Sequence, residues 1–162
     1  MVYILMGVSG SGKSTIGREL AKVLKIPFYD ADLFHPRSNV EKMSRGIPLT
    51  DQDRLPWLKQ LSEQIRKWEK QGDCVLACSA LKKSYREILS QGIPEKVKFI
   101  FLQGSIECIR DRIRLRKGHY MPPSLLESQF ETLEIPGDAI TVSIENSPGL
   151  ILENIIRKLK GN

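Results

Sequence analysis

The chain has 162 residues, of which 41% are hydrophobic and 27% charged, and its formal net charge is +6. A chain of this length forms one domain and buries roughly 70% of its unfolded surface. Its apolar stretches are too short to cross a bilayer, and no signal-like segment is recognisable. We therefore expect a cytoplasmic, soluble protein without a membrane partner, and the positive charge favours an anionic ligand.

The first predicted element is a strand from Val2 to Met6, and it is followed by a glycine-rich sequence of the form G-x-x-x-x-G-K-[ST]. This pattern lies between a strand and a helix, which is where a phosphate-binding loop must lie. Glycines allow the backbone N–H groups to approach phosphate oxygens, and the helix N-terminus adds further donors. A glycine-rich turn that matches by chance is the alternative. The residues predicted to bind ATP are Gly7, Val8, Ser9, Gly10, Ser11, Gly12, Lys13, Ser14 and Thr15.

Two members of this loop have chemical roles in the prediction. Lys13 can reach the β- and γ-phosphates and stabilise the transferred group, so we count it as catalytic. The Ser14 hydroxyl can be a ligand of Mg²⁺, which would be bound together with ATP. The sequence therefore predicts a nucleoside triphosphate site at the first strand.

A helix is predicted from Ser14 to Leu24, and a second strand from Ile26 to Tyr29 ends in Asp30-Ala31-Asp32. The two carboxylates point to the same side and can serve one site together. One of them can hold Mg²⁺ through water while the other accepts the proton of a substrate hydroxyl. We assign the metal to Asp30 and the proton to Asp32, although the residues alone leave the two roles open. A turn or N-cap aspartate is the alternative for each.

Residues 33–53 are polar and contain helix breakers, so we expect a loop-rich insertion that carries function. A helix is predicted from about Leu55 to Lys70, with Trp57 and Trp68 in the core. Further strands are expected at Cys74 to Cys78, Val97 to Leu102 and Ala139 to Ile144, and further helices at Lys82 to Leu89, after Ser105, after Pro122-Pro123 and at Leu150 to Leu159. Ser105 is expected to cap the helix that follows it. Ser124 and Glu127 are expected to form a capping box at the start of the next helix.

Strands alternate with helices along the whole chain, which predicts an α/β fold with a parallel five-stranded sheet covered by helices on both faces. Ligands of such sheets bind at the carboxyl ends of the strands. We divide the single domain into a core (1–32, 72–110 and 137–162), a substrate-binding insertion (33–71) and a lid (111–136).

Several motifs, in order along the chain, closely resemble those of the gluconokinase family. They are Asp30-Ala31-Asp32-Leu33-Phe34-His35-Pro36, Asn39, Lys42-Met43, Gly46-Ile47-Pro48-Leu49, the segment from Asp51 to Leu58, the segment from Cys78 to Arg86, Arg116-Lys117-Gly118-His119 and the segment from Ser128 to Pro136. Tyr120 stands where the family more often has Phe, and the segment after about Asp138 is generic.

The resemblance implies a P-loop kinase with the fold of the nucleoside monophosphate and shikimate kinases, with a substrate-binding insertion and a mobile lid. Its reaction would be transfer of the ATP γ-phosphoryl group to the 6-hydroxyl of D-gluconate, giving 6-phospho-D-gluconate and ADP for the pentose phosphate pathway, with Mg²⁺ as cofactor. Members of the family are often dimers, so a homodimer is one expected state.

Gluconate has a carboxylate and a row of hydroxyls, so its site needs cations and hydrogen-bonding side chains. Residues of these types, on different loops, are His35, Arg54, Lys82 and Arg86, which with Asp32 form the predicted substrate site. A salt bridge to Asp51 or Asp53 is the alternative for Arg54. A solvated helix face is the alternative for Lys82 and Arg86. Asp53 is as easily a helix cap as a ligand.

The predicted lid contains a basic helix in which Arg112 and Arg116 are spaced to share one face. In the related kinases, such a pair has one arginine beside the adenine and one that clamps phosphate as a finger supplied in cis, so both are assigned to ATP and Arg116 also to catalysis. His119 is included in the substrate site, with an exposed loop histidine as its alternative.

Two other functions compete with this prediction. A kinase of the same fold for shikimate or a nucleotide is disfavoured because the block from His35 to Trp57 has no counterpart expected in those families. An ATP-dependent RNA-binding protein would explain the charge of +6. It is disfavoured because the chain has no recognisable RNA-binding module and no aromatic residues interleaved on its basic helix, so we expect no nucleic-acid partner.

Overall fold

The computed structural model describes residues 1–115 and 122–161. Its centre is a sheet of five parallel strands in the order β2-β3-β1-β4-β5. The strands are β1 (Val2–Met6), β2 (Phe28–Asp30), β3 (Cys74–Ala77), β4 (Val97–Gln103) and β5 (Ile140–Ser143). The predicted α/β class is confirmed. Each predicted apolar run forms one strand of the sheet, and the sheet is covered on both faces, as parallel sheets usually are.

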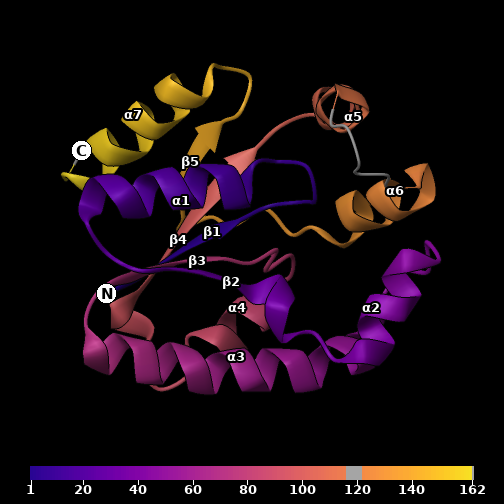
Figure 1. The fold of residues 1–162 in the computed structure, drawn as a ribbon, viewed down its shortest axis with the longest axis horizontal. Helices are drawn as coiled ribbons and strands as arrows, with labels where there is room; N and C mark the ends of the chain where they lie inside the picture. The colour runs from indigo at the N-terminus through magenta and orange to yellow at the C-terminus, as the bar shows by residue number, and fades with distance from the viewer. Residues whose placement is uncertain (116–121, 162) are drawn as a thin grey trace.

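Helices cover both faces of this sheet, as Figure 1 shows. One face is covered by α1 (Lys13–Leu24) and α7 (Pro148–Leu159), and the other by α3 (Asp51–Gln71) and α4 (Lys83–Leu89). The side toward which the strands run carries α2 (Arg37–Ser44), α5 (Ile106–Leu115), α6 (Pro123–Thr132) and the 3-10 helix η1 (Ala31–Phe34), while η2 (Pro94–Lys96) precedes β4. The segments predicted to carry chemistry therefore gather at one end of the molecule.

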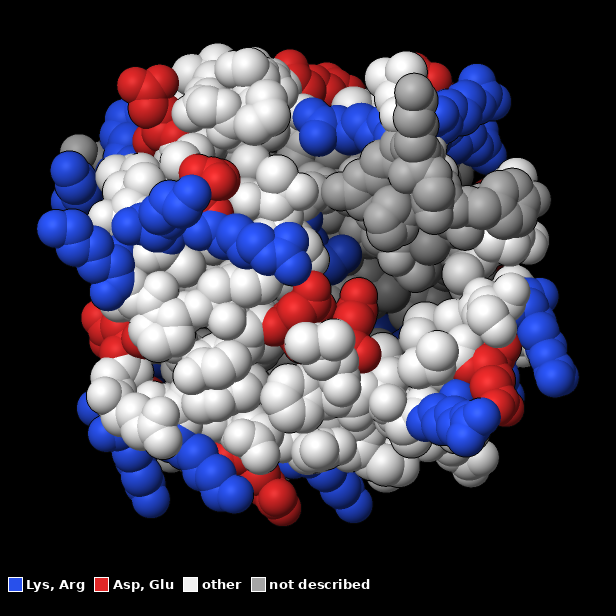
Figure 2. Space-filling view, viewed as in Figure 1, with Lys and Arg blue, Asp and Glu red and all other residues white. Residues whose placement is uncertain are grey.

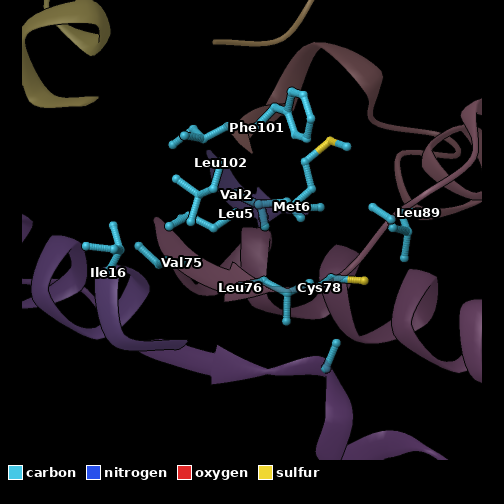
Figure 3. Close-up of a cluster of buried hydrophobic side chains, with 14 of the residues drawn as sticks. Val2, Leu5, Met6, Ile16, Val75, Leu76, Cys78, Leu89, Phe101 and Leu102 are labelled. Atoms are coloured by element: carbon cyan, nitrogen blue, oxygen red, sulfur yellow. The ribbon is translucent and has the colours of Figure 1, made fainter. Parts of the chain in front are cut away.

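The side chains of β1 form the middle of the core. Ile4 lies opposite Leu76 of β3 and Phe99 of β4, and Ile4 and Leu76 are inaccessible to solvent. Figure 3 shows the side chains of these strands packed together, flanked by Ile16 of α1 and Leu89 of α4. Full burial of one such side chain contributes about 1.5–3 kcal/mol, so this cluster fixes the position of the loop that follows β1.

The expectation of a loop-rich segment at residues 33–53 is wrong, because α2 lies within it and α3 begins at Asp51. The start of α3 is a capping box. The Thr50 hydroxyl accepts a hydrogen bond from the Asp53 N–H at 3.1 Å, and the Asp53 carboxylate accepts one from the Thr50 N–H at 2.9 Å. Pro56 lies inside α3. The sequence predicted a start at about Leu55, and the proline is close enough to the N-terminus of the longer helix to be accommodated.

The expected capping box of Ser124 and Glu127 is also wrong. Helix α6 begins at Pro123 with Pro122 as N-cap, and no side chain caps it. A proline at the first helical position loses no hydrogen bond and has the right φ, so the helix begins before Ser124. The Glu127 carboxylate instead accepts a hydrogen bond from Arg110 at 3.0 Å. The Ser105 cap is confirmed, because its hydroxyl accepts from the Cys108 N–H at 3.1 Å.

Both tryptophans are buried, as predicted. Trp68 stacks on Tyr29 with ring centroids 3.9 Å apart. Within the described residues, no helix is long and apolar enough to cross a membrane.

Candidate active site

The loop after β1 has the shape of a phosphate cradle. Gly7, Gly10 and Gly12 have φ angles of 149°, 82° and 96°, which other residues rarely adopt. A Cβ at Gly10 would lie 2.8 Å from Ile113, and one at Gly7 would lie 2.9 Å from the Ser11 hydroxyl. The Ser11 hydroxyl is fully buried and has no hydrogen-bond partner among the described residues. These features suit a loop that is completed by a phosphate ligand.

Lys13 and Ser14 begin α1 directly behind this loop. The Lys13 ammonium donates a hydrogen bond to the Val8 carbonyl at 3.0 Å, so it folds back over the loop. The Ser14 hydroxyl donates to one carboxylate oxygen of Asp30 at 2.9 Å. The other oxygen of Asp30 accepts from the Asp32 N–H at 3.0 Å. Asp30 therefore caps η1 and joins β2 to the phosphate loop.

Asp32 follows at the start of η1 with its residue surface exposed. The protein atoms that surround its carboxyl nevertheless raise its pKa, because they displace part of the water that would solvate the charge. Lys13 opposes this rise, and the Asp30 carboxylate adds to it. Lys13 and Asp30 are therefore close enough to Asp32 to affect the pKa of its carboxyl. A carboxyl whose pKa is raised is a better proton acceptor than an ordinary aspartate once it is ionised.

His35 lies at the other end of η1, against α3. Its ring stacks on Trp57 at a centroid distance of 4.0 Å and an interplanar angle of 14°. The Trp57 indole N–H donates to the Ala31 carbonyl at 2.8 Å, so the same tryptophan supports both ends of η1. Burial, and secondarily the positive charge of Arg54, lower the pKa of His35 to about 4. His35 is therefore neutral near pH 7.

Asn39 of α2 is buried and connects His35 to α3. Its amide nitrogen lies 2.9 Å from the Asp53 carbonyl and 3.2 Å from Nδ1 of His35. The Asp53 carboxylate accepts a hydrogen bond from Lys42 at 2.8 Å. Hydrogen bonds from Lys42 and from the Thr50 backbone lower the pKa of Asp53 to about 2. Asp53 is thus a helix cap, as one reading of the sequence proposed, and a support for α2.

Arg54 is buried at the start of α3, and the expected alternative of a salt bridge to Asp51 or Asp53 is not formed. Its guanidinium donates to the Leu49 carbonyl at 2.8 Å and to the Tyr85 hydroxyl at 3.2 Å. It also lies over the Tyr85 ring, 5.5 Å from the centroid. The side chain is therefore held in place by neutral partners.

Lys82 and Tyr85, at the start of α4, both contact the carboxylate of Asp51, the first residue of α3. Lys82 donates to its two oxygens at 3.0 and 3.1 Å, and the Tyr85 hydroxyl donates to it as well. Hydrogen bonds from Tyr85 and Lys82 lower the pKa of Asp51, and the bond to Asp51 raises that of Lys82. Lys82 is therefore ion-paired across two helices, which rules out the solvated-face alternative.

Arg86 is buried, which again rules out the solvated face, but it points to backbone groups. It donates to the Ala80 carbonyl at 2.7 Å, to the Leu81 carbonyl at 3.2 Å and to the Glu134 carbonyl at 3.0 Å. It also lines a pocket of about 480 Å³ shared with Glu134 and Asp138. The hydrogen bonds of Arg86 among the described residues therefore go to backbone carbonyls, and its contact with the substrate stays a prediction.

The helices of the predicted lid contact the phosphate loop. Arg112 of α5 donates to the Ile144 carbonyl, and one of its nitrogens would lie 3.9 Å from a Cβ at Gly12. Gln129 of α6 accepts from the Ser9 N–H at 2.7 Å and donates to the Ser9 hydroxyl at 3.0 Å. Arg112 therefore lies beside the loop, its binding to ATP stays a prediction, and Gln129 is hydrogen-bonded to the loop.

Arg116 and His119 lie outside the described residues, and so does the expected shared face of Arg112 and Arg116. The roles of Asn39, Tyr85 and Gln129 were missed from the sequence. All three lie in the family motifs quoted above, which was the available signal, but nothing in their type or spacing indicates what they contact.

Lysine and arginine are dispersed over the face of the molecule drawn in Figure 2, with acidic side chains between them. The described residues also contain no group of three or more His, Cys, Asp or Glu side chains placed to hold a metal ion. A metal at Ser14 and Asp30 would thus be held mainly by water and phosphate, as Mg²⁺ usually is.

Comparisons with known proteins agree with this geometry. A model of the shikimate kinase family matches residues 9–134. The chain is 48% identical to a gluconokinase of Gluconobacter oxydans (95% of this chain and 88% of that protein), and 42% identical to the thermoresistant gluconokinase of Escherichia coli (98% and 93%).

Solved structures include a gluconokinase from Sinorhizobium meliloti 1021, with 41% identity, a TM-score of 0.90 and coverage of 98% of this chain and 91% of that one. A shikimate kinase from Aquifex aeolicus has 20% identity and a TM-score of 0.62 over 100% and 98% of the two chains, which shows a shared fold. With a phosphate cradle, paired aspartates and relatives of this similarity over nearly its whole length, the chain belongs to the gluconokinase family of shikimate kinase-like P-loop kinases.

Proposed function

We propose that the protein transfers the γ-phosphoryl group of ATP to the 6-hydroxyl of D-gluconate, giving 6-phospho-D-gluconate and ADP. The observation that carries this proposal is the junction Asp30-Ala31-Asp32. It is hydrogen-bonded to Ser14, at the end of the phosphate loop, and to the Trp57 indole. Trp57 belongs to the half of the site built from η1, α2, α3 and α4, which we call the acceptor half. A junction with contacts to both halves suits a transfer between a nucleotide and a second substrate.

The transfer proceeds in the proposal by attack of the gluconate O6 on the γ-phosphorus as the bond from that phosphorus to the ADP oxygen breaks. The proton of the hydroxyl passes to the Asp32 carboxylate. The raised pKa of Asp32 supports this choice of base, and the two hydrogen bonds at Asp30 support the other role for that residue. Lys13 and, by family resemblance, Arg116 compensate the charge of the transferring group.

Mg²⁺ would be held by the Ser14 hydroxyl and, through water, by Asp30. The Ser14 hydroxyl and the Asp30 carboxylate, 2.9 Å apart at the foot of the phosphate cradle, suit an ion that takes its other ligands from water and phosphate. The ion supplies positive charge at the phosphate oxygens when it is bound.

The acceptor site in the proposal consists of Asp32, His35, Arg54 and Lys82, with His119 added by resemblance. Arg54 and Lys82 are the cations that suit the gluconate carboxylate, and His35 and Asp32 suit its hydroxyls. Arg86 stays a prediction of the resemblance, since its hydrogen bonds among the described residues all go to backbone carbonyls. A homodimer and a cytoplasmic location, where ATP is available, belong to the same proposal.

The test is an ADP-release assay with D-gluconate and, in parallel, with shikimate, followed by identification of the phosphorylated product. We expect ADP release that depends on gluconate, formation of 6-phosphogluconate and loss of turnover in Asp32→Asn. Equal turnover with shikimate, or ATP consumption that does not respond to gluconate, would refute the proposed acceptor.

A further inference from the structure

The contacts of Asn39 determine which nitrogen of His35 carries the proton. The Asp53 carbonyl can only accept a hydrogen bond, so the atom of Asn39 that lies 2.9 Å from it must be the amide nitrogen. The same nitrogen lies 3.2 Å from Nδ1 of His35. An amide NH₂ group has two protons and no acceptor, so its second proton points to Nδ1, which must be unprotonated.

The surroundings of His35 also keep the ring neutral. Its stacking on Trp57 removes water from one face, and Arg54, buried on α3, opposes a second positive charge. The nearby carboxylates are already paired. Asp53 accepts hydrogen bonds from Lys42 and the Thr50 N–H, and Asp51 accepts them from Lys82 and Tyr85. A neutral imidazole without a proton on Nδ1 has its proton on Nε2.

We propose that Asn39 is a positioning residue of the kinase. It holds His35 as the neutral Nε2–H tautomer, so that the ring donates one hydrogen bond to a hydroxyl of the acceptor substrate. Within residues 1–115 and 122–161, Nε2 has no hydrogen-bond partner. The substrate carboxylate is left to Arg54 and Lys82, which are cations at any physiological pH. This inference rests on the proposed function for the identity of the acceptor, but the tautomer itself does not.

The tautomer can be measured directly by ¹⁵N NMR, because the chain has two histidines. The resonances that disappear in His35→Gln belong to His35. We expect an unprotonated Nδ1 and a protonated Nε2 between pH 5.5 and 8, with no titration near pH 6.5. A proton on Nδ1, or an ordinary histidine titration, would overturn the inference without any variant of Asn39.

Asn39→Asp tests the positioning role. A carboxylate beside Nδ1 accepts a proton from it, so the ring becomes the other tautomer or a cation and its pKa rises. We expect KM for gluconate to rise about tenfold, the effect of one lost hydrogen bond, with KM for ATP within twofold of wild type. Ser38→Ala, on the exposed side of the same helix, is the matched control.

His35→Gln and His35→Asn separate the role of Nε2 from that of the ring. The Gln amide reaches about as far as Nε2 and can still donate, while Asn reaches only as far as Nδ1. We expect Gln to retain about ten times more kcat/KM for gluconate than Asn. Equal losses in both, or an Asn39→Asp variant that raises KM for ATP as much as that for gluconate, would mean that this cluster is only structural. Should the wild type fail to phosphorylate gluconate, the proposed function would fall while the NMR result would stand.

Discussion

The two halves of the candidate site are built in different ways. The phosphate loop is made from backbone groups, and its shape depends on glycines with positive φ and on one helix N-terminus. The acceptor half is made from side chains of η1, α2, α3 and α4 that support one another, as in the chain from Asp53 through Asn39 to His35. A backbone site needs a short, nearly contiguous motif, whereas a side-chain site needs several segments to fold together first.

This difference predicts how far the effect of a substitution should extend from the substituted residue. A change in the phosphate half should leave its neighbours in place and remove one chemical contribution. A change in the acceptor half should spread, because Asn39, Arg54 and Asp53 there each have two or more hydrogen-bond partners.

Asp32 is the proposed base for the transfer itself, so its substitution should have the largest effect. Asp32→Asn keeps the size of the side chain but cannot accept the proton, and we expect kcat to fall by 10² to 10⁴-fold, as for loss of a general base. Nucleotide affinity, measured by calorimetry, should change little. A normal kcat with weakened nucleotide binding would instead assign Asp32 to the metal and require another base.

Lys13→Ala tests the phosphate half alone. Removal of the ammonium should lower kcat on the order of 10²-fold or more, while thermal unfolding stays close to wild type. Lys22→Ala, an exposed lysine on the same helix, is the control. Turnover within twofold of wild type in Lys13→Ala would contradict the assignment of the loop.

Gln129→Ala tests the contact between α6 and the phosphate loop. Loss of its two hydrogen bonds to Ser9 should raise KM for ATP about tenfold, because the loop must then be held by the nucleotide alone. Amide hydrogen exchange should quicken at Ser9 and in α6. Unchanged exchange at both places would show that the contact contributes nothing to their order.

Thr50→Ala and Ser124→Ala compare a helix cap that the structure contains with one that only the sequence suggested. Thr50→Ala should lower the free energy of unfolding by about 1 kcal/mol, the usual value for loss of an N-cap. Ser124→Ala should change it by less than about 0.5 kcal/mol, as is normal for an exposed residue. Urea denaturation of both variants gives the comparison, and equal losses would contradict the helix boundaries described above.

The last prediction concerns pH. The pKa of His35 is lowered to about 4 in the folded protein from 6.5 in the unfolded chain. Between these values the unfolded chain takes up a proton that the folded protein does not, so stability falls as pH falls through this window. His35→Gln cannot take up this proton, and its denaturation midpoint should decline less between pH 6.5 and 4.5. Parallel declines would mean that the histidine has an ordinary pKa.

The sequence predicted the sheet, the phosphate loop and the junction at Asp30 because each depends on a local pattern. Thr50 with Asp53 was also a local pattern, but Asp in place of Glu hid the capping box. The contacts of Gln129 could not be predicted, because its partner Ser9 is distant in the chain and any polar residue on α6 fits the same periodicity. The contacts of Arg86 could not be predicted either, because its charge suggested a substrate ligand and nothing in its spacing indicates the backbone carbonyls to which it donates.

The central position of β1 has a consequence for how the chain is made. Val2 lies opposite Cys74 on one side and Val97 on the other, so β1 is synthesised long before either neighbour exists. Such distant pairings form slowly because a long loop must close first. An apolar strand with two unpaired edges is prone to aggregate until its pairings with the neighbouring strands form. On the ribosome, the strand that carries the phosphate loop must wait unpaired until β3 and then β4 emerge, so nucleotide binding can begin only late in synthesis.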